Sequence, residues 1–272
     1  MKKTLLLIIA LGGSLLAYND YDMDGVDDKT DRCPNTSFNE LVDINGCTIK
    51  NLKSSHNFAI IMGIDYSQKN YDTLEDTDTL SQSLQIDYYY KNFSLQASSS
   101  YYNSQSTTYN NSGMNDSFLG AYYKLKPIKN LTIRFGGGII LPTYNSDLNN
   151  NNSDFSTSLS LSYTLKKINI FSGLSHTIIN DDDIVSDDTL VLYQNTISKN
   201  IGIGFYPTSK NYFSVGYNVS DSIYKDVQEI KTLSFNTFYN IDANWFATAN
   251  YAKGLSDTAS DNYLSLRLGY YF

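Results

Sequence analysis

The sequence predicts an all-β protein: a 12-stranded antiparallel transmembrane β-barrel that follows a short N-terminal calcium-binding loop module. Three observations support this fold class. From residue 56 onward, apolar and polar residues alternate with a period of two, as in strands with one apolar face. Short and long connections alternate between these runs, and the number of runs is even. Before residue 53 the chain is acidic and lacks this alternation.

Composition and charge exclude several classes of protein. The 272 residues include 20 Lys and Arg against 28 Asp and Glu, for a net charge of -8, so the chain lacks the basic surface that nucleic-acid binding requires. Only 18% of the residues are charged, whereas Tyr occurs 24 times. Tyr and Thr favour strands, and the Ala, Leu, Glu and Lys pattern of a helical bundle is missing.

Residues 1–17 are typical of a secretory signal peptide. Lys2 and Lys3 precede an apolar run over 5–11, and Ala17 is the expected last residue before cleavage. That run is too short to span a membrane as a helix. The exported protein is therefore expected either to be soluble or to enter a membrane as a β-barrel.

Residues 18–52 form a separate acidic module in which carboxylates recur along one loop. Gly25 permits a sharp turn that directs neighbouring carboxylates toward one hard cation. The alternative is a solvated acidic linker. The candidate metal ligands are Asp20, Asp22, Asp24, Asp28 and Asp31.

The chain has two cysteines, Cys33 and Cys47, which lie in the same module. A cysteine pair in an exported protein is typical of one disulfide. The alternative is a zinc site, for which two thiolates lack two further ligands.

The run from 20 to 47 resembles a thrombospondin type-3 repeat, in the form found as a linker in OmpA-type outer-membrane proteins. The Asp ladder, Cys33-Pro34-Asn35-Thr36 and Val42-Asp43-x-x-Gly46-Cys47 carry the resemblance. It implies calcium binding and a Cys33–Cys47 bridge. Little more than one repeat is present, and no OmpA-like peptidoglycan-binding domain follows in the sequence.

Twelve alternating runs make up the predicted barrel over residues 53–272. In the first, Phe58, Ile60 and Met62 share one face, and runs of about ten residues suit tilted strands that cross a bilayer. The pattern does not fix the register of the seventh and eighth runs. The runs span residues 58–66, 84–90, 93–101, 119–125, 131–141, 155–165, 168–174, 197–205, 213–219, 233–239, 245–251 and 264–272.

A soluble β-sandwich would alternate as well, so the connections decide between the two folds. Long connections are expected at 67–79, 103–116, 142–154, 177–189, 221–231 and 253–262, with short ones between them. Short periplasmic turns and long external loops are the pattern of outer-membrane barrels. The long loops hold most acids, and lysines are assigned to the short turns: Lys91, Lys126, Lys129, Lys166, Lys167, Lys199 and Lys210.

The C-terminal half carries two further resemblances. The closing run, Leu-Arg-Leu-Gly-Tyr-Tyr-Phe, looks like the C-terminal strand signal of outer-membrane barrels, which implies that the barrel-assembly machinery binds the Phe272 strand. Gly-Gly-Ile-Ile-Leu-Pro-Thr at 137–143 and Tyr-Ala-Lys-Gly-Leu-Ser-Asp at 251–257 resemble the outer-membrane transporter family named for the meta-pathway of phenol degradation. That resemblance implies a channel that admits hydrophobic or aromatic compounds.

Five ionisable residues fall on the inner face of the predicted barrel and are the candidate pore-lining residues. Two acids and three bases nearly balance, so weak ion selectivity is expected. In the alternative, opposite charges pair across the lumen and close it. The five are Asp65, Asp87, Lys124, Arg134 and Arg267.

The sequence therefore favours a passive outer-membrane channel for small neutral or hydrophobic solutes in a Gram-negative bacterium, with a periplasmic calcium module. Expected partners are outer-membrane lipid, lipopolysaccharide and an unidentified small-molecule permeant. The alternative is a non-conducting structural or adhesive barrel that binds partners or lipopolysaccharide through its long loops. Catalysis is not expected, because the two histidines, His56 and His176, lie in no nucleophile–base motif.

Overall fold

The computed structural model describes residues 26–28, 30–33, 36, 42–47, 56–68, 76–108, 110–144, 151–185 and 190–272. The chain divides into two units, 1–55 and 56–272, and each is described by itself. The predicted signal peptide and the candidate ligands Asp20, Asp22 and Asp24 lie outside the described residues. Among these described residues, no helix is long and apolar enough to cross a membrane.

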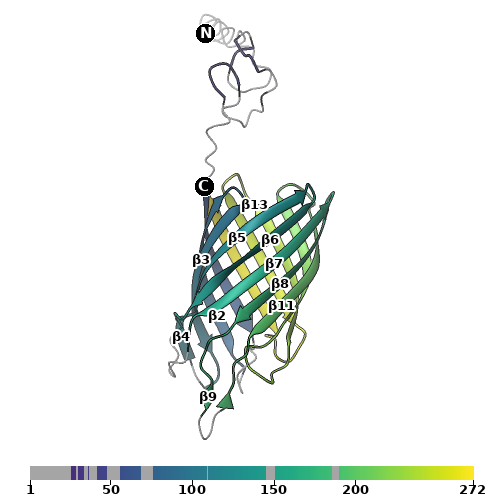
Figure 1. Cartoon of the computed structure of the whole chain (residues 1–272). Coiled ribbons are helices and arrows are strands. Elements are labelled where there is room, and N and C mark those ends of the chain that lie inside the picture. Colours follow the sequence, from purple (N-terminus) through teal and green to yellow (C-terminus); the bar gives the residue numbers. More distant parts are fainter. Residues whose placement is uncertain are drawn as a thin grey trace, which may run out of the picture. The chain divides into compact units, whose positions relative to one another are not determined.

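The second unit is a closed antiparallel barrel of twelve long strands (Figure 1). Each strand pairs with its neighbours in the chain, and β1 pairs with β15 to close the ring, as the sequence predicts. The strands are β1 (His56–Gln68), β2 (Asp78–Tyr90), β3 (Phe93–Gln105), β5 (Ser117–Ile128), β6 (Leu131–Leu141), β7 (Asp154–Leu165), β8 (Ile168–Ile178), β11 (Thr196–Phe205), β12 (Asn211–Ser220), β13 (Ile230–Asn240), β14 (Trp245–Gly254) and β15 (Asn262–Tyr271).

Three short strands lie in the long connections, where the sequence predicts only loops. β4 (Asn110–Met114) pairs with the end of β3, and β9 (Ile184–Val185) pairs with β10 (Leu190–Val191) outside the barrel sheet. The alternation rule misses β4 because its first three residues are all polar, and it misses β9 and β10 because two residues are too few to show a period. A strand beyond the lipid-facing belt needs no apolar side.

The two ends of the barrel differ, and they are named here by their connections. The turn end carries the short turns, His56 and Phe272, and the loop end carries the long connections and β9 (Figure 1). Lys91 and Lys166 take positive φ values of 53° and 54° in two-residue turns. Lys199 does not lie in a turn as predicted: it is within β11, opposite Leu174 and Val219 on the outer face.

Large apolar side chains cover the outside of the barrel rather than a core. Met62 is 65% exposed and Ile201 60%, whereas the buried hydrophobic residues of the described chain are Ala59, Tyr102 and Ala259. Aromatic rings gather near the turn end, where Trp245 packs on Tyr270 at 4.9 Å between centroids. An apolar band bordered by aromatic residues is the surface that a membrane barrel presents to lipid.

Glycines on the inner wall let aromatic rings lie against neighbouring strands. A Cβ on Gly136 would lie 2.5 Å from the Tyr122 ring, and one on Gly202 would overlap the Phe171 ring. Without side chains, these positions leave room for each ring beside the backbone. The rings therefore occupy space along the wall that a side chain at the glycine position would otherwise fill.

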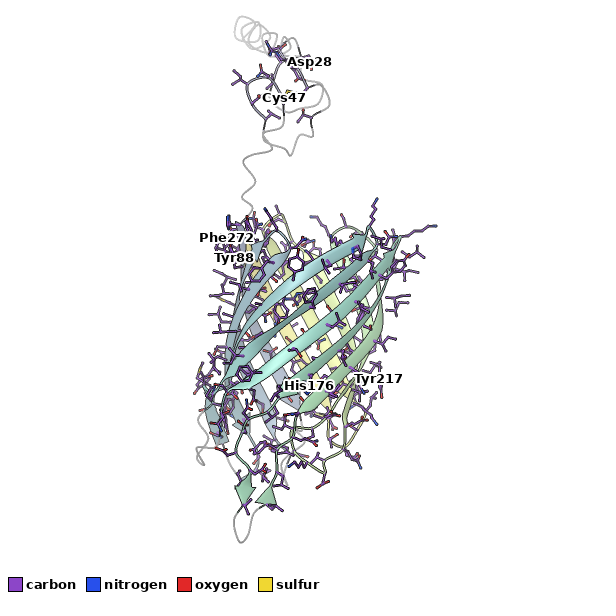
Figure 2. The ribbon with its side chains drawn as sticks, viewed as in Figure 1. Asp28, Cys47, Tyr88, His176, Tyr217 and Phe272 are labelled. Carbon is purple, nitrogen blue, oxygen red and sulfur yellow. A yellow bond between two sulfur atoms is a disulfide. The ribbon has the colours of Figure 1, made fainter. Side chains whose placement is uncertain are left out.

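In the first unit, a disulfide joins Cys33 and Cys47, as the sequence predicts (Figure 2). The Arg32 N–H donates to the Asn45 carbonyl at 2.8 Å and ties the two halves of the loop together. Gly46 adopts a φ of 74°, a left-handed conformation that glycine accepts at low cost.

Candidate functional site

The candidate site is the barrel lumen, and the structure places all five predicted ionisable residues on its inner face. Each alternates along its strand with outward apolar residues. Lys124, for example, lies between Tyr123 and Leu125, which are both 40% exposed. Residues that are directly opposite in register share a face, so Lys124 and Arg134 lie side by side on the inner wall.

Asp65 lies toward the loop end of β1 and is held by neutral donors. The Ser83 hydroxyl donates to Asp65 at 3.1 Å, and the Tyr263 hydroxyl donates at 3.0 Å. A cavity of about 400 Å³ opens here, and Asp65, Asp116 and Arg267 are among the residues that line it. This part of the lumen is polar and carries both signs of charge.

Arg267 and Asp87 are connected through an amide rather than by direct contact. Arg267 donates to Gln85 Oε1 at 3.4 Å, and Gln85 Nε2 donates to both Asp87 oxygens at 3.1 and 3.0 Å. The Tyr89 hydroxyl donates to Asp87 at 2.9 Å. Asp87 is only 7% exposed, so three hydrogen bonds satisfy its carboxylate within the wall.

Arg134 is held by an aromatic face. Its guanidinium carbon lies 3.6 Å from the centroid of the Tyr122 ring, which in turn lies over Gly136. A cation above a ring face is attracted by the ring quadrupole. In the described chain, none of the five candidate residues forms an ion pair with another, so the alternative in which paired charges close the lumen is not seen there.

Four asparagines that the sequence reading missed form a second wall of the lumen. Asn250 donates to Asn236 on the neighbouring strand, and Asn218 donates to Ser234 at 3.1 Å. Asn200 lies directly opposite Asn218. Asn236 and Asn250 alternate with outward Phe235 and Tyr251, so the sequence carries a signal for them. The predicted pore-lining residues are all ionisable and do not include these amides.

Two further cavities lie against this asparagine wall. One of about 640 Å³ is lined by Asn236, Asn250 and Arg267, and one of about 500 Å³ by all four asparagines and Phe171. Tyr263 lines both of them and also the cavity beside Asp65. The three spaces share Tyr263 as a lining residue, and together they form a hollow inside the barrel with both polar and aromatic lining.

The two histidines lie on the outer surface, away from this hollow. The His56 Nδ1 and Tyr88 hydroxyl are 2.6 Å apart at the turn end, and the His56 ring stacks on Tyr90. His176 is exposed toward the loop end (Figure 2), and Ser175 faces the opposite side of β8. Neighbouring Ser175 and His176 therefore form no nucleophile–base pair.

Of the five candidate metal ligands, Asp28 and Asp31 lie among the described residues of the N-terminal module. Asp31 Oδ1 accepts the Cys33 N–H at 2.8 Å, and its Oδ2 is buried without a hydrogen-bond partner in the described residues. Asp43 accepts the N–H groups of Asn45 and Cys47, which lower the pKa of its carboxyl. In the described part of the chain, no group of three potential ligands is close enough to hold a metal ion.

Comparisons with known proteins place the barrel in a family. Residues 62–272 match the family described as "Putative MetA-pathway of phenol degradation". The chain belongs to this family. The match covers all the barrel strands except the first part of β1. A search of curated protein sequences gives no significant match.

Solved structures share the barrel fold with this member of the phenol-degradation family. The NanC porin is 14% identical, with a TM-score of 0.51, over 77% of this chain and 97% of that chain. The β domain of the Bordetella autotransporter BrkA is 10% identical, with a TM-score of 0.51, over 80% and 99%. The NalP translocator domain from Neisseria meningitidis is 13% identical, with a TM-score of 0.50, over 82% and 90%.

Proposed function

We propose that this protein is a passive channel in the outer membrane of a Gram-negative bacterium. The apolar outer face and the aromatic residues near the turn end suit a lipid bilayer. Barrel strands of 10 to 13 residues match the length that a tilted strand needs to cross the hydrocarbon. In this proposal the turn end and the N-terminal module face the periplasm, and the long loops face the outside.

The observation that carries the channel is the hollow interior. Three cavities of about 640, 500 and 400 Å³ share Tyr263 as a lining residue inside a closed ring of strands. A barrel whose lumen was filled by side chains would have no such spaces. Lining by amides, hydroxyls and wall-bound aromatic rings supports passage of small neutral or hydrophobic solutes, and the family description supports aromatic compounds among them.

Two positions on β14 give a matched test of the channel. Asn250 faces the hollow, whereas Ala247 lies opposite outward Leu268 and lines none of the three cavities. In planar bilayers, the wild-type protein should give discrete conductance steps. Asn250→Trp should reduce their size by filling the lumen, and Ala247→Trp should leave them unchanged. A silent wild-type protein, or equal effects of both substitutions, would contradict the channel.

The barrel itself is tested by membrane fractionation and by gel migration with and without heating. The folded barrel should migrate differently from the heated chain, and it should remain with the membrane pellet. Recovery of the protein in the soluble fraction with no heat-dependent shift would contradict membrane insertion.

The N-terminal module is proposed to bind Ca²⁺ through Asp20, Asp22, Asp24, Asp28 and Asp31. The buried, unpartnered Oδ2 of Asp31 supports this, because such an oxygen suits a hard cation. Calorimetric titration of the full chain with Ca²⁺ should give saturable heat that Asp31→Asn weakens. Asp43→Asn is the control, because backbone N–H groups occupy that carboxylate. An absence of saturable heat would remove the site.

A further inference from the structure

Lys124 and Arg134 form a pair of like charges on the inner wall. They are directly opposite in the β5–β6 register, where like charges repel. Both side chains are exposed, and among the described residues no carboxylate forms an ion pair with either. Such a pair is stabilised by any anion that comes between the two cations.

Arg134 is also held in a way that leaves its donors available. The Tyr122 ring contacts the face of its guanidinium, with 3.6 Å between the guanidinium carbon and the ring centroid. Stacking on the face leaves the five N–H donors at the edge for other partners. These donors form a planar fork that matches the two oxygens of a carboxylate.

The acidic residues of the lumen are less available than these cations. Asp87 is 7% exposed and accepts hydrogen bonds from Gln85 and Tyr89. Asp65 is half-buried, accepts from Ser83 and Tyr263, and lies toward the other end of the barrel. The prediction of weak selectivity gives all five charges the same weight. It therefore understates the positive charge that a solute meets near the turn end.

We infer that Lys124 and Arg134 form an anion-binding subsite in the lumen that accepts small organic carboxylates. The inference rests on the proposed channel and names a class of solute that it favours. Arg134 binds the carboxylate through two parallel N–H donors of its guanidinium, and Lys124 supplies a second positive charge on a flexible side chain. Tyr122 positions Arg134 and does not itself bind the anion.

Reversal potentials across a salt gradient test the charge preference. With potassium chloride at low concentration, where screening is weak, the wild-type channel should favour chloride over potassium. Lys124→Gln with Arg134→Gln should abolish that preference, and Arg134→Glu should reverse it. Lys199→Gln, on the outer face of β11, is the matched control and should behave as wild type. Heat-dependent gel migration checks that every variant is folded.

Benzoate tests the carboxylate itself, with benzyl alcohol as its neutral counterpart. Benzoate should interrupt the chloride current of the wild-type channel at concentrations where benzyl alcohol does not. Arg134→Lys should retain the chloride preference and lose several-fold in benzoate sensitivity, because an ammonium lacks the planar fork.

The outcomes separate the two proposals. A wild-type protein that gives no conductance refutes the channel, and with it the subsite as a step in permeation. A conducting wild-type protein without chloride preference, or a double variant that keeps it, overturns the subsite and leaves the channel standing. Equal block by benzoate and benzyl alcohol overturns the carboxylate assignment.

Discussion

Phe58 and Phe272 exchange two backbone hydrogen bonds, with N–O distances of 2.7 and 2.9 Å. Their rings also stack, with centroids 5.6 Å apart. Phe58 lies near the start of β1 and Phe272 directly follows β15, so this pair closes the ring of strands at the turn end. Both ends of the barrel segment are fixed at the same contact.

Removing the Phe272 ring should weaken closure less than removing the whole residue. Phe272→Ala should lower the free energy of unfolding by about 0.5–1.5 kcal/mol, because only the ring contact is lost. Deletion of Phe272 also removes the backbone exchange, and it should give a lower urea midpoint. Phe213→Ala is the control, since Phe213 is 49% exposed on the outer face and Phe272 52%. Equal urea midpoints for Phe272→Ala and the deletion would contradict this account.

Gly136→Ala should both destabilise the barrel and narrow the lumen. The added Cβ would overlap the Ala121 carbonyl oxygen and lie 2.5 Å from Tyr122 Cδ1, so the β5 backbone and the Tyr122 ring must both move. We expect a loss of about 1–3 kcal/mol in urea unfolding and a smaller conductance step. At Gly216 the nearest atom to an added Cβ is the Ser234 hydroxyl at 3.2 Å, so Gly216→Ala is the control. Equal effects at both glycines would refute the crowding at Gly136.

Lys166→Asn should stabilise the turn between β7 and β8. Lys166 has a φ of 54°, in the left-handed region that costs most L-residues about 1–2 kcal/mol and that asparagine adopts more readily. The urea midpoint should rise. Lys167→Asn, at the next position, should not raise it. A rise at Lys167 alone would show that the left-handed conformation is not the cause.

Asp242 should make turn-end stability depend on pH. Its carboxylate accepts the N–H groups of Trp245 and Asn244 at 2.7 and 2.8 Å, and these hydrogen bonds lower its pKa below the ordinary value of 3.8. A lowered folded pKa gives stability that is present above 3.8 and is lost as the pH falls through the folded pKa. Urea unfolding of wild type and Asp242→Asn should therefore differ at pH 6 and converge at strongly acidic pH. A constant difference would contradict the assignment.

The strands could be predicted because lipid constrains one face of each. Phe58, Ile60 and Met62 must be apolar where they face hydrocarbon, so a period of two appears in the sequence. Beyond the lipid this constraint ends, and β4, β9 and β10 left no such pattern. Lys199 lies within the predicted run over 197–205, so its assignment to a short turn disagreed with the alternation itself.

The inner face of the candidate site was predictable, but its chemistry was only partly so. Alternation assigned Asp87 and Arg134 to the lumen, yet it could not show that Gln85 and Tyr89 cover Asp87 while Arg134 stays exposed. Those differences depend on rotamers and on side chains from neighbouring strands. The asparagine wall was predictable from the sequence, because Asn236 and Asn250 follow the same period of two as the ionisable residues of the inner face.

The placement of apolar residues outside the barrel separates two tasks that compete in most proteins. In a globular enzyme, the residues that line a site often pack the core as well, so a change of specificity also changes the free energy of unfolding. Here the apolar surface faces outward, and the hollow near Tyr263 is lined mainly by polar side chains. The lining can therefore diverge among relatives while the lipid-facing wall stays constant, and one scaffold can acquire different solute preferences by changing residues such as Asn236 and Asn250.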